Sequence, residues 1–165
     1  MSTTAFIKKS EGLYDAPKAF VSADDIITQA QDILREGVQS GQPITDPKAA
    51  VDFLQMSLAN EDNEHFAALF MNTRNVVIAF ERLFSGSVDQ SAVYPRVVVQ
   101  RALALNASAV IFAHNHPSGD CEPSRSDKRI TKDLVDALGL INVRVLDHFV
   151  VSQANWVSLA EQGWL

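Results

Sequence analysis

The sequence has a single cysteine and no long apolar run among its 165 residues. Cys121 alone cannot form a disulfide within the chain, which fits a reducing compartment. A membrane-spanning helix needs about 20 consecutive apolar residues, and no stretch here approaches that length. The first residues, MSTTAFIKKSEGLYD, also lack the apolar core of a secretory signal. We therefore expect a cytoplasmic protein that does not span a membrane.

The chain also lacks an excess of positive charge. It contains 14 Lys and Arg residues against 20 Asp and Glu residues, a formal net charge of −6. Proteins that bind DNA broadly through its phosphates have a basic surface, so this kind of binding is not indicated. The basic residues between positions 125 and 132 alternate with acidic ones, which is typical of a solvated, mixed-charge helix face. We predict no nucleic-acid-binding residues.

The sequence shows no internal repeat, and its 47% apolar content is enough for one globular core. Residues 1–21 have little periodicity and are expected to form a loose arm. Residues 22–37 predict an amphipathic helix that begins with a capping box formed by Ser22 and Asp25. We therefore divide the chain into an N-terminal arm with one amphipathic helix, residues 1–44, and a domain, residues 45–165.

The domain alternates helical and strand-like segments. Asp46 and Pro47 are typical of a helix start, and two apolar runs around NTRN predict a β-hairpin. The run SAVIFA is apolar throughout, as in a strand that is covered on both faces. The expected order is helix 45–60, hairpin 64–84, helix 94–106, strand 108–113, helix 124–140, strand 143–151 and a short closing helix or strand. This order predicts a layered α/β domain.

Residues 114–127, HNHPSGDCEPSRSD, follow directly after the apolar run AVIFA. Side chains two positions apart on a strand point to the same side, so His114 and His116 can present their rings to one point. Imidazole nitrogens and carboxylate oxygens are common zinc ligands, and Asp127 lies one loop away. Three protein ligands and an open fourth position are typical of catalytic zinc. We predict one Zn²⁺ per chain at these residues.

The same stretch has other interpretations. Ser124 and Asp127 have the spacing of a capping box, which needs no metal but can also hold a ligand in place. Cys121 could supply a thiolate as a fourth ligand, although a solvent-exposed bystander is the favoured interpretation. Asn115, between the two histidines, is expected to point to the opposite side and to brace the loop.

The stretch matches the JAMM (MPN+/JAB) metalloprotease signature, H-x-H-P followed by six residues and S-x-x-D. It resembles the bacterial RadC family more closely, in which H-N-H-P-S-G and P-S-x-x-D are characteristic. Further segments that resemble this family are EHFAALFMNTRNVVIAFERLFSGSV, YPRVVVQRALALNASAVIFAHNHPSG and VRVLDHFVV. The resemblance runs from about residue 45 to the C-terminus. Longer RadC proteins have a helix-hairpin-helix-like region that residues 1–44 do not show, so this chain resembles the short form.

The resemblance implies a JAB/MPN-like fold of the cytidine-deaminase-like kind, with a mixed β-sheet flanked by helices. It implies the same three metal ligands and adds a glutamate as general base. The family's E-x-F segment corresponds to residues 64–66, which makes Glu64 the predicted base, with Glu61 and Glu81 as rivals. Ser124 would help to stabilise the oxyanion of the transition state.

Two residues of the late strand are candidates for supporting the site. Asp147 and His148 are expected either to orient a ligating imidazole, as metal-bound histidines usually require, or to form a structural ion pair or hydrogen bond at the strand end.

A site of this kind would cleave a peptide or isopeptide amide with metal-activated water, so the predicted class is a JAMM-type metallopeptidase. The alternative is a non-catalytic metal-binding module associated with DNA repair or mobile-element functions. Phosphodiester cleavage is disfavoured because no second acidic metal cluster is visible. The protein or peptide substrate cannot be read from the chain, and DNA stays open as a partner. A homo-oligomer could form through the arm or a strand edge.

Overall fold

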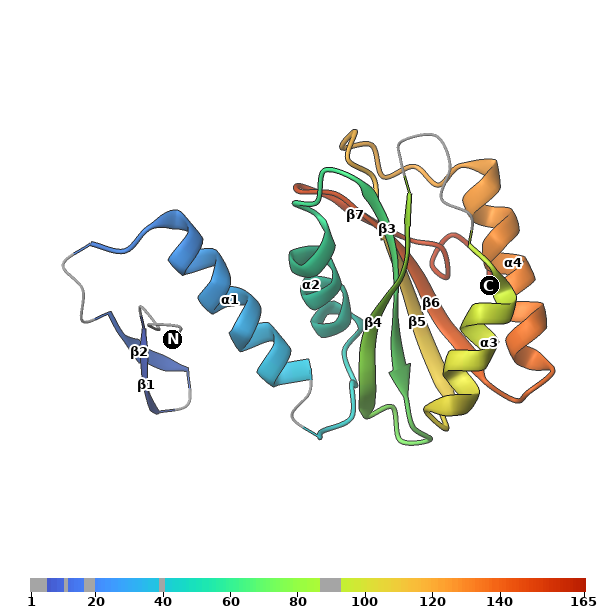
Figure 1. The fold of residues 1–165 in the computed structure, drawn as a ribbon, viewed down its shortest axis with the longest axis horizontal. Coiled ribbons are helices and arrows are strands. Elements are labelled where there is room, and N and C mark those ends of the chain that lie inside the picture. The colour runs from blue at the N-terminus through green and yellow to red at the C-terminus, as the bar shows by residue number, and fades with distance from the viewer. Residues whose placement is uncertain (1–5, 11, 17–19, 39–40, 87–92) are drawn as a thin grey trace.

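The fold comes from a computed structural model that describes residues 6–10, 12–16, 20–38, 41–86 and 93–165. The elements in chain order (Figure 1) are β1 (Ile7–Ser10), β2 (Leu13–Asp15), α1 (Ala23–Val38), α2 (Pro47–Leu58), β3 (Glu64–Met71), β4 (Val77–Gly86), α3 (Pro95–Ala104), β5 (Ala109–Asn115), α4 (Arg125–Gly139), β6 (Arg144–Val151) and β7 (Trp156–Ser158). Among the described residues, no helix has the length and apolar character needed to cross a membrane.

A five-stranded mixed sheet in the order β4-β3-β5-β6-β7 forms the centre of the molecule. β5 and β6 pair in parallel, and the other neighbours pair antiparallel. The predicted hairpin is confirmed as β3 and β4. β5 is buried along its whole length, as expected of a central strand covered on both faces. The predicted fold class, a mixed sheet flanked by helices, is confirmed.

Helices cover both faces of this sheet (Figure 1). α2 packs with one set of alternating strand residues, which includes Ile111 and Ala113 of β5. α3 and α4 pack with the other set, which includes Val110 and Phe112. Because successive strand residues point to opposite faces, His114 lies on the face that α3 and α4 cover.

The starts of two helices follow the sequence signals. Asp46 caps α2 by accepting a hydrogen bond from the Lys48 amide, with Pro47 in the first turn. Ser124 and Asp127 form a reciprocal capping box at the start of α4. A side chain in a first turn is held close to the helix end, so the cap fixes where Asp127 stands relative to the sheet.

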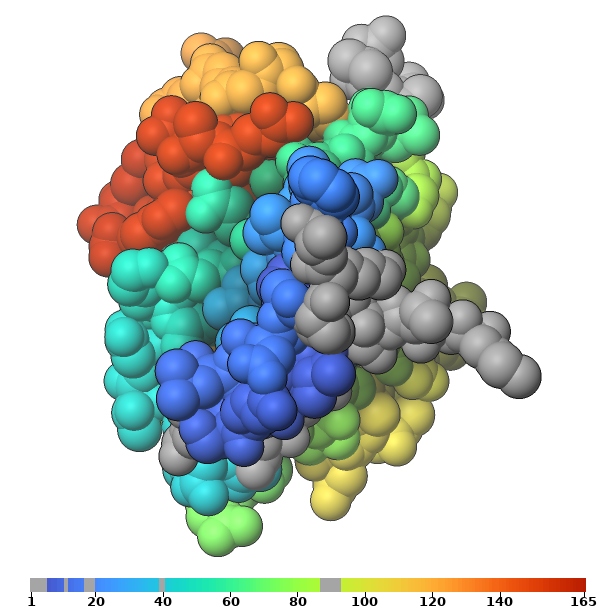
Figure 2. All heavy atoms as spheres, turned by 90° about the vertical axis from the view of Figure 1, so that its left-hand side faces the viewer, coloured from blue at the N-terminus to red at the C-terminus, as the bar shows by residue number. Residues whose placement is uncertain are grey.

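The N-terminal arm contains more structure than the sequence predicted. β1 and β2 form a small antiparallel hairpin where a loose segment was expected. The capping box of Ser22 and Asp25 is present, and α1 follows it. Leu34 and Val38 of α1 join the core on the α2 side of the sheet. Figure 2 looks at the molecule from this side, with the arm in blue in front of α2.

Candidate metal site

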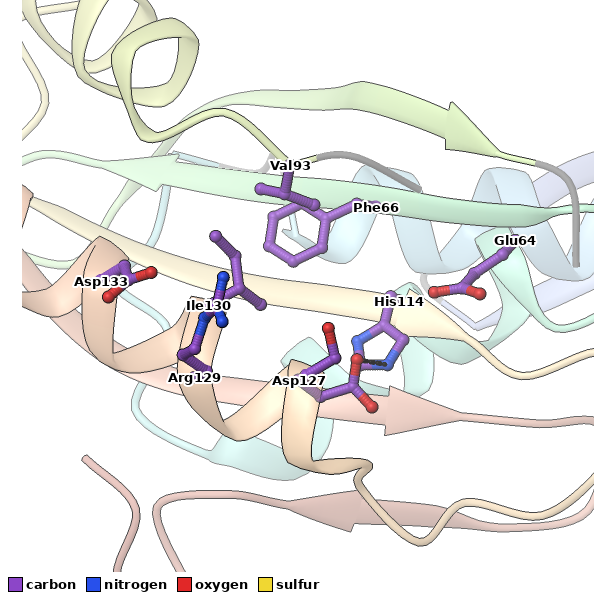
Figure 3. Close-up of a pocket in the computed structure, with 9 residues that line it drawn as sticks. Glu64, Phe66, Val93, His114, Asp127, Arg129, Ile130 and Asp133 are labelled. Carbon is purple, nitrogen blue, oxygen red and sulfur yellow. Dashed lines mark ion pairs between the residues drawn. The ribbon is translucent and has the colours of Figure 1, made fainter. Parts of the chain in front are cut away.

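Four side chains meet at one end of the sheet, on the face that α3 and α4 cover. They come from the start of β3, the end of β5 and the first turn of α4, and one potential ligand atom from each lies within 4.8 Å of the others. The residues are Glu64, His114, His116 and Asp127. β3 runs antiparallel to β5, with Phe66 opposite His114. Glu64 therefore lies next to the end of β5, and Figure 3 shows its carboxylate turned toward the His114 ring.

The nitrogen and oxygen atoms of this cluster face one another closely. The Nε2 atoms of His114 and His116 are 3.0 Å apart. Asp127 lies beside both rings, with Oδ1 3.5 Å from Nε2 of His114 and Oδ2 3.7 Å from Nε2 of His116. Two ring nitrogens and one carboxylate thus point at a common centre.

The loop after β5 sets the orientation of the His116 ring. Nδ1 of His116 is 2.6 Å from the carbonyl oxygen of Asp120, and since a carbonyl only accepts, Nδ1 carries the proton. Gly119 allows the tight turn, because its φ of 87° favours glycine. In the neutral ring, Nε2 is therefore unprotonated, and its lone pair is directed at the cluster.

His114 is supported from inside the protein. Its side chain is buried, and its Nδ1 lies 2.8 Å from Nε2 of His148. Nδ1 of His148 lies 2.6 Å from the hydroxyl of Thr131. Burial lowers the pKa of His148 well below its usual value, so the neutral ring is favoured. The sequence left two roles open for His148, orienting a ligating ring or forming a structural pair, and the first agrees with this contact. It missed Thr131, whose only signal is its position four residues after Asp127.

The capping box of α4 holds the Asp127 carboxylate in place. The Ser124 amide donates to Oδ2 at 2.7 Å, and the Ser124 hydroxyl accepts from the Asp127 amide at 3.1 Å. Burial opposes ionisation of Asp127, but the neighbouring rings of His114 and His116 outweigh it and hold the pKa of this carboxyl well below its usual range. The Asp127 carboxylate in turn raises the pKa of His116, against the effect of burial.

Among the three glutamates that the sequence left as candidate bases, only Glu64 belongs to the cluster. Glu61 forms an ion pair with Arg82, with Oε1 2.7 Å from Nη1. Glu81 lies on β4 and forms a bidentate pair with Arg101. Both rivals therefore have arginine partners away from the cluster.

Asn115, the last residue of β5, links this strand to the segment that carries Glu64. Its fully buried carboxamide accepts from the His65 amide at 2.8 Å and donates to the carbonyl of Asn63 at 3.0 Å. These two contacts flank Glu64 on both sides. The expected orientation of Asn115, opposite to the histidines, agrees with these contacts, but it braces the start of β3 instead of the loop.

Among the described hydrogen bonds, none joins Asp147 to a ligating ring, although its Oδ1 accepts one from the backbone amide of His148 at 2.7 Å. It precedes His148 on β6, so its side chain points to the other face of the sheet. Its Oδ2 accepts from the Ser158 hydroxyl at 2.7 Å, and its Oδ1 accepts from the Ala160 amide at 3.1 Å. The second interpretation, a structural hydrogen bond, therefore applies to Asp147, while His148 alone contacts a cluster histidine.

Cys121 also differs from expectation. The sequence favoured a solvent-exposed bystander, but the side chain is only 6% exposed and packs with Val150 and Leu159. Its thiol lies 3.2 Å from the carbonyl of Asn155. The thiol therefore joins the loop after β5 to the segment that directly precedes β7 and is not part of the cluster.

A groove of about 270 Å³ opens beside the cluster (Figure 3). Apolar side chains from β3, α4 and the segment before α3 form one part of its wall, and charged groups form the rest. The lining residues are Glu64, Phe66, Val93, His114, Ser126, Asp127, Arg129, Ile130 and Asp133. The cluster is therefore accessible from a cavity that could accept part of a substrate.

The donor set fits a divalent metal ion. Two imidazole nitrogens with their other nitrogens engaged, together with carboxylates, are ligands that zinc accepts. Without a positive charge between them, two lone pairs and an ionised carboxylate at this spacing would repel each other. The cluster could therefore hold a metal ion.

Comparison with known proteins agrees with this geometry. The family model described as RadC-like JAB domain matches residues 44–164. The chain belongs to the RadC-like JAB family. A UPF0758 protein of Ectopseudomonas mendocina is 45% identical over 156 residues, which cover 94% of this chain and 70% of that protein. A UPF0758 protein of Methylibium petroleiphilum is 47% identical over 162 residues, 98% of this chain and 72% of that protein.

Another relative of this RadC-like chain is similar over a shorter stretch. A UPF0758 protein of Chromohalobacter salexigens is 55% identical over 128 residues, which are 78% of this chain and 57% of that protein. This chain therefore spans roughly three fifths to three quarters of the length of these three relatives.

Proposed function

We propose that this chain is a zinc-dependent hydrolase of the JAMM metallopeptidase type. His114, His116 and Asp127 would hold the ion, and Glu64 would act as the general base. The observation that carries the proposal is the position of Glu64, whose carboxylate joins the two histidines and the aspartate within 4.8 Å while its two rivals pair with arginines.

The chemistry would divide between the ion and the chain. When bound, the ion supplies Lewis acidity that acidifies water and polarises a carbonyl. Glu64 would take the proton of the attacking water and deliver it to the leaving amine. The Ser124 hydroxyl accepts from the Asp127 amide, so its own O–H is left to donate a hydrogen bond, which it would direct at the developing oxyanion.

The groove supports a peptide or isopeptide amide as substrate. Its apolar wall could receive a side chain next to the scissile bond, and Glu64 and His114 border the same cavity. We further propose a cytoplasmic location, a division of the chain between the arm and the domain at residues 44 and 45, and a homo-oligomer as a form to test.

A substitution of the base tests the function. Glu64→Gln keeps a similar shape but cannot accept the proton, so it should retain zinc and lose about 10²–10⁴-fold in hydrolysis of an internally quenched peptide library or of isopeptide-linked peptides. Glu61→Gln is the matched control, because this neighbour pairs with Arg82; it should hydrolyse as the wild type does.

Two results would contradict the proposal. Equal hydrolysis by Glu64→Gln and the wild type would remove Glu64 from the mechanism. A zinc-loaded wild type with no turnover on either substrate class would favour the alternative, a non-catalytic metal-binding module associated with DNA repair or mobile-element functions.

A further inference from the structure

We propose that Thr131, acting through His148, fixes which nitrogen of His114 is presented to the metal site. Thr131 is then a positioning residue, two side chains away from the ion. This inference rests on the proposed function for its consequence in metal binding, but its hydrogen-bond order can be tested without metal.

The direction of the chain of hydrogen bonds follows from its first member. The Thr131 hydroxyl lies 2.6 Å from the carbonyl oxygen of Asp127, one turn earlier on α4. A carbonyl cannot donate, so the hydroxyl donates its only proton in this hydrogen bond. The same hydroxyl lies 2.6 Å from Nδ1 of His148, and toward this partner it can only accept. Nδ1 of His148 must therefore carry a proton.

His148 passes this constraint to His114. Within the described part of the chain, its ring is hydrogen-bonded to His114 and Thr131 and not to a carboxylate. The ring is fully buried, so a neutral imidazole with one proton is favoured. With that proton on Nδ1, Nε2 is an acceptor. Nε2 lies 2.8 Å from Nδ1 of His114, which must donate. The neutral His114 ring then presents an unprotonated Nε2 to the site.

The chain of hydrogen bonds begins at the backbone of Asp127 and ends beside its side chain. The backbone carbonyl of Asp127 accepts the first hydrogen bond, and its carboxylate lies 3.5 Å from Nε2 of His114, the nitrogen that this chain leaves unprotonated. One residue of α4 thus supplies a predicted ligand and, through its backbone, sets the state of another. This arrangement explains why a threonine inside a helix is turned inward beside a buried histidine.

Because these side chains are buried, only this order of donors and acceptors gives each of them its hydrogen-bond partners. Thr131, His148 and His114 are at most 1% exposed, so bulk water cannot supply a missing partner. Phe66 and Phe112 contact the His148 ring edge-on at centroid distances of 5.3 and 6.0 Å, which restricts rotation of the ring. The reverse order would take the hydroxyl proton from the Asp127 carbonyl and point an N–H of His114 at the ion.

The first experiment reads the ring protons directly. Long-range ¹H–¹⁵N correlation spectra of metal-free wild-type protein distinguish protonated from unprotonated ring nitrogens. We expect a proton on Nδ1 of both His148 and His114. An unprotonated Nδ1 on either ring would overturn the inference, whatever the protein does with metal.

The second experiment breaks the first bond of the chain. Thr131→Val keeps the shape but removes the hydroxyl, so Nδ1–H of His148 loses its acceptor and the order of both rings can reverse. We expect zinc affinity, measured by competition with a chromogenic chelator, to fall about 10–100-fold. Thr131→Ser restores the hydroxyl and should bind zinc within about threefold of the wild type, an estimate that uses the same scale.

The outcomes separate this inference from the proposed function. Wild-type affinity in Thr131→Val, or an equal loss in Thr131→Ser, would contradict the role of the hydroxyl. If Thr131→Val does not fold, the wild-type spectra and the serine variant still decide. Correct ring protons in a wild type that binds no zinc would leave the hydrogen-bond order intact and reject the metal site instead.

Discussion

The two parts of the molecule differ in what they bury. The domain buries His114, Asn115, Thr131 and His148 and gives each of them hydrogen-bond partners. The arm buries only Val38 among its described residues and exposes large apolar side chains: Ile7 by 50%, Leu13 by 64%, Phe20 by 90% and Ile26 by 55%.

This difference indicates which part of the chain stability and the site depend on. Buried polar groups destabilise a fold unless they are paired, so a domain that gathers several of them near one point is organised around what they do there. The exposed apolar groups of the arm contribute little to the core. Changes at these buried positions of the domain should therefore alter stability and the site, whereas changes at the exposed apolar positions of the arm should leave both nearly unchanged.

Core substitutions should give the largest effect. Leu134 of α4 is fully buried on the face that holds the cluster, so Leu134→Ala should lower the free energy of unfolding by about 2–5 kcal/mol. Leu13→Ala, on the exposed hairpin, should change it by no more than about 0.5 kcal/mol. Urea denaturation of both variants measures the contrast, and equal losses would show that the arm belongs to the same cooperative core.

A second substitution tests the buried brace next to Glu64. Asn115→Ala removes the contacts that flank Glu64 and should slow hydrolysis about 10–100-fold by displacing the base, while zinc content stays at the wild-type level. Some loss of stability, about 1–3 kcal/mol, should accompany it, because the partners of the amide are left unpaired. Asn60→Ala, at an exposed position, is the control. Loss of zinc together with activity would contradict a role that is confined to placing Glu64.

The smallest effect should come from the ion pair on β4. The hydrogen bond from Arg101 lowers the pKa of Glu81 from its ordinary value of 4.5, against partial burial. The pair therefore stabilises the fold above that ordinary value and loses its effect as the pH falls through the lowered pKa of the folded state.

Glu81→Gln should accordingly lower the melting temperature by about 1–3 °C at pH 7 and by nothing measurable in acid below the lowered pKa. Hydrolysis should not change, since Glu81 lies outside the cluster. A difference in melting temperature that persists unchanged in acid would contradict the ion-pair interpretation.

Local signals in the sequence predicted most of the domain. Asp46 with Pro47 and Ser124 with Asp127 announce helix starts, because a cap depends only on residues close in sequence. The apolar run before His114 predicted a strand covered on both faces, and β5 is one. The hairpin of the arm was missed because its strands, IKKS and LYD, are too short for a periodic pattern to show.

Long-range packing decided what the sequence left open. Alternation along β6 means that only one of Asp147 and His148 can face the cluster, but which one depends on how β6 pairs with β5. Thr131 gains its role only because α4 crosses His148. Cys121 is buried because the loop folds against Asn155. None of these contacts leaves a pattern within a short window of sequence.

The central claim, that the cluster is a metal site, is tested most directly by metal content. The protein would be purified without added metal or an affinity tag, and zinc measured in the wild type and in His116→Ala. We predict about one zinc per chain in the wild type and none in the variant, with the variant still folded by circular dichroism. A wild type that is purified without zinc, or a variant that keeps its zinc, would contradict the claim.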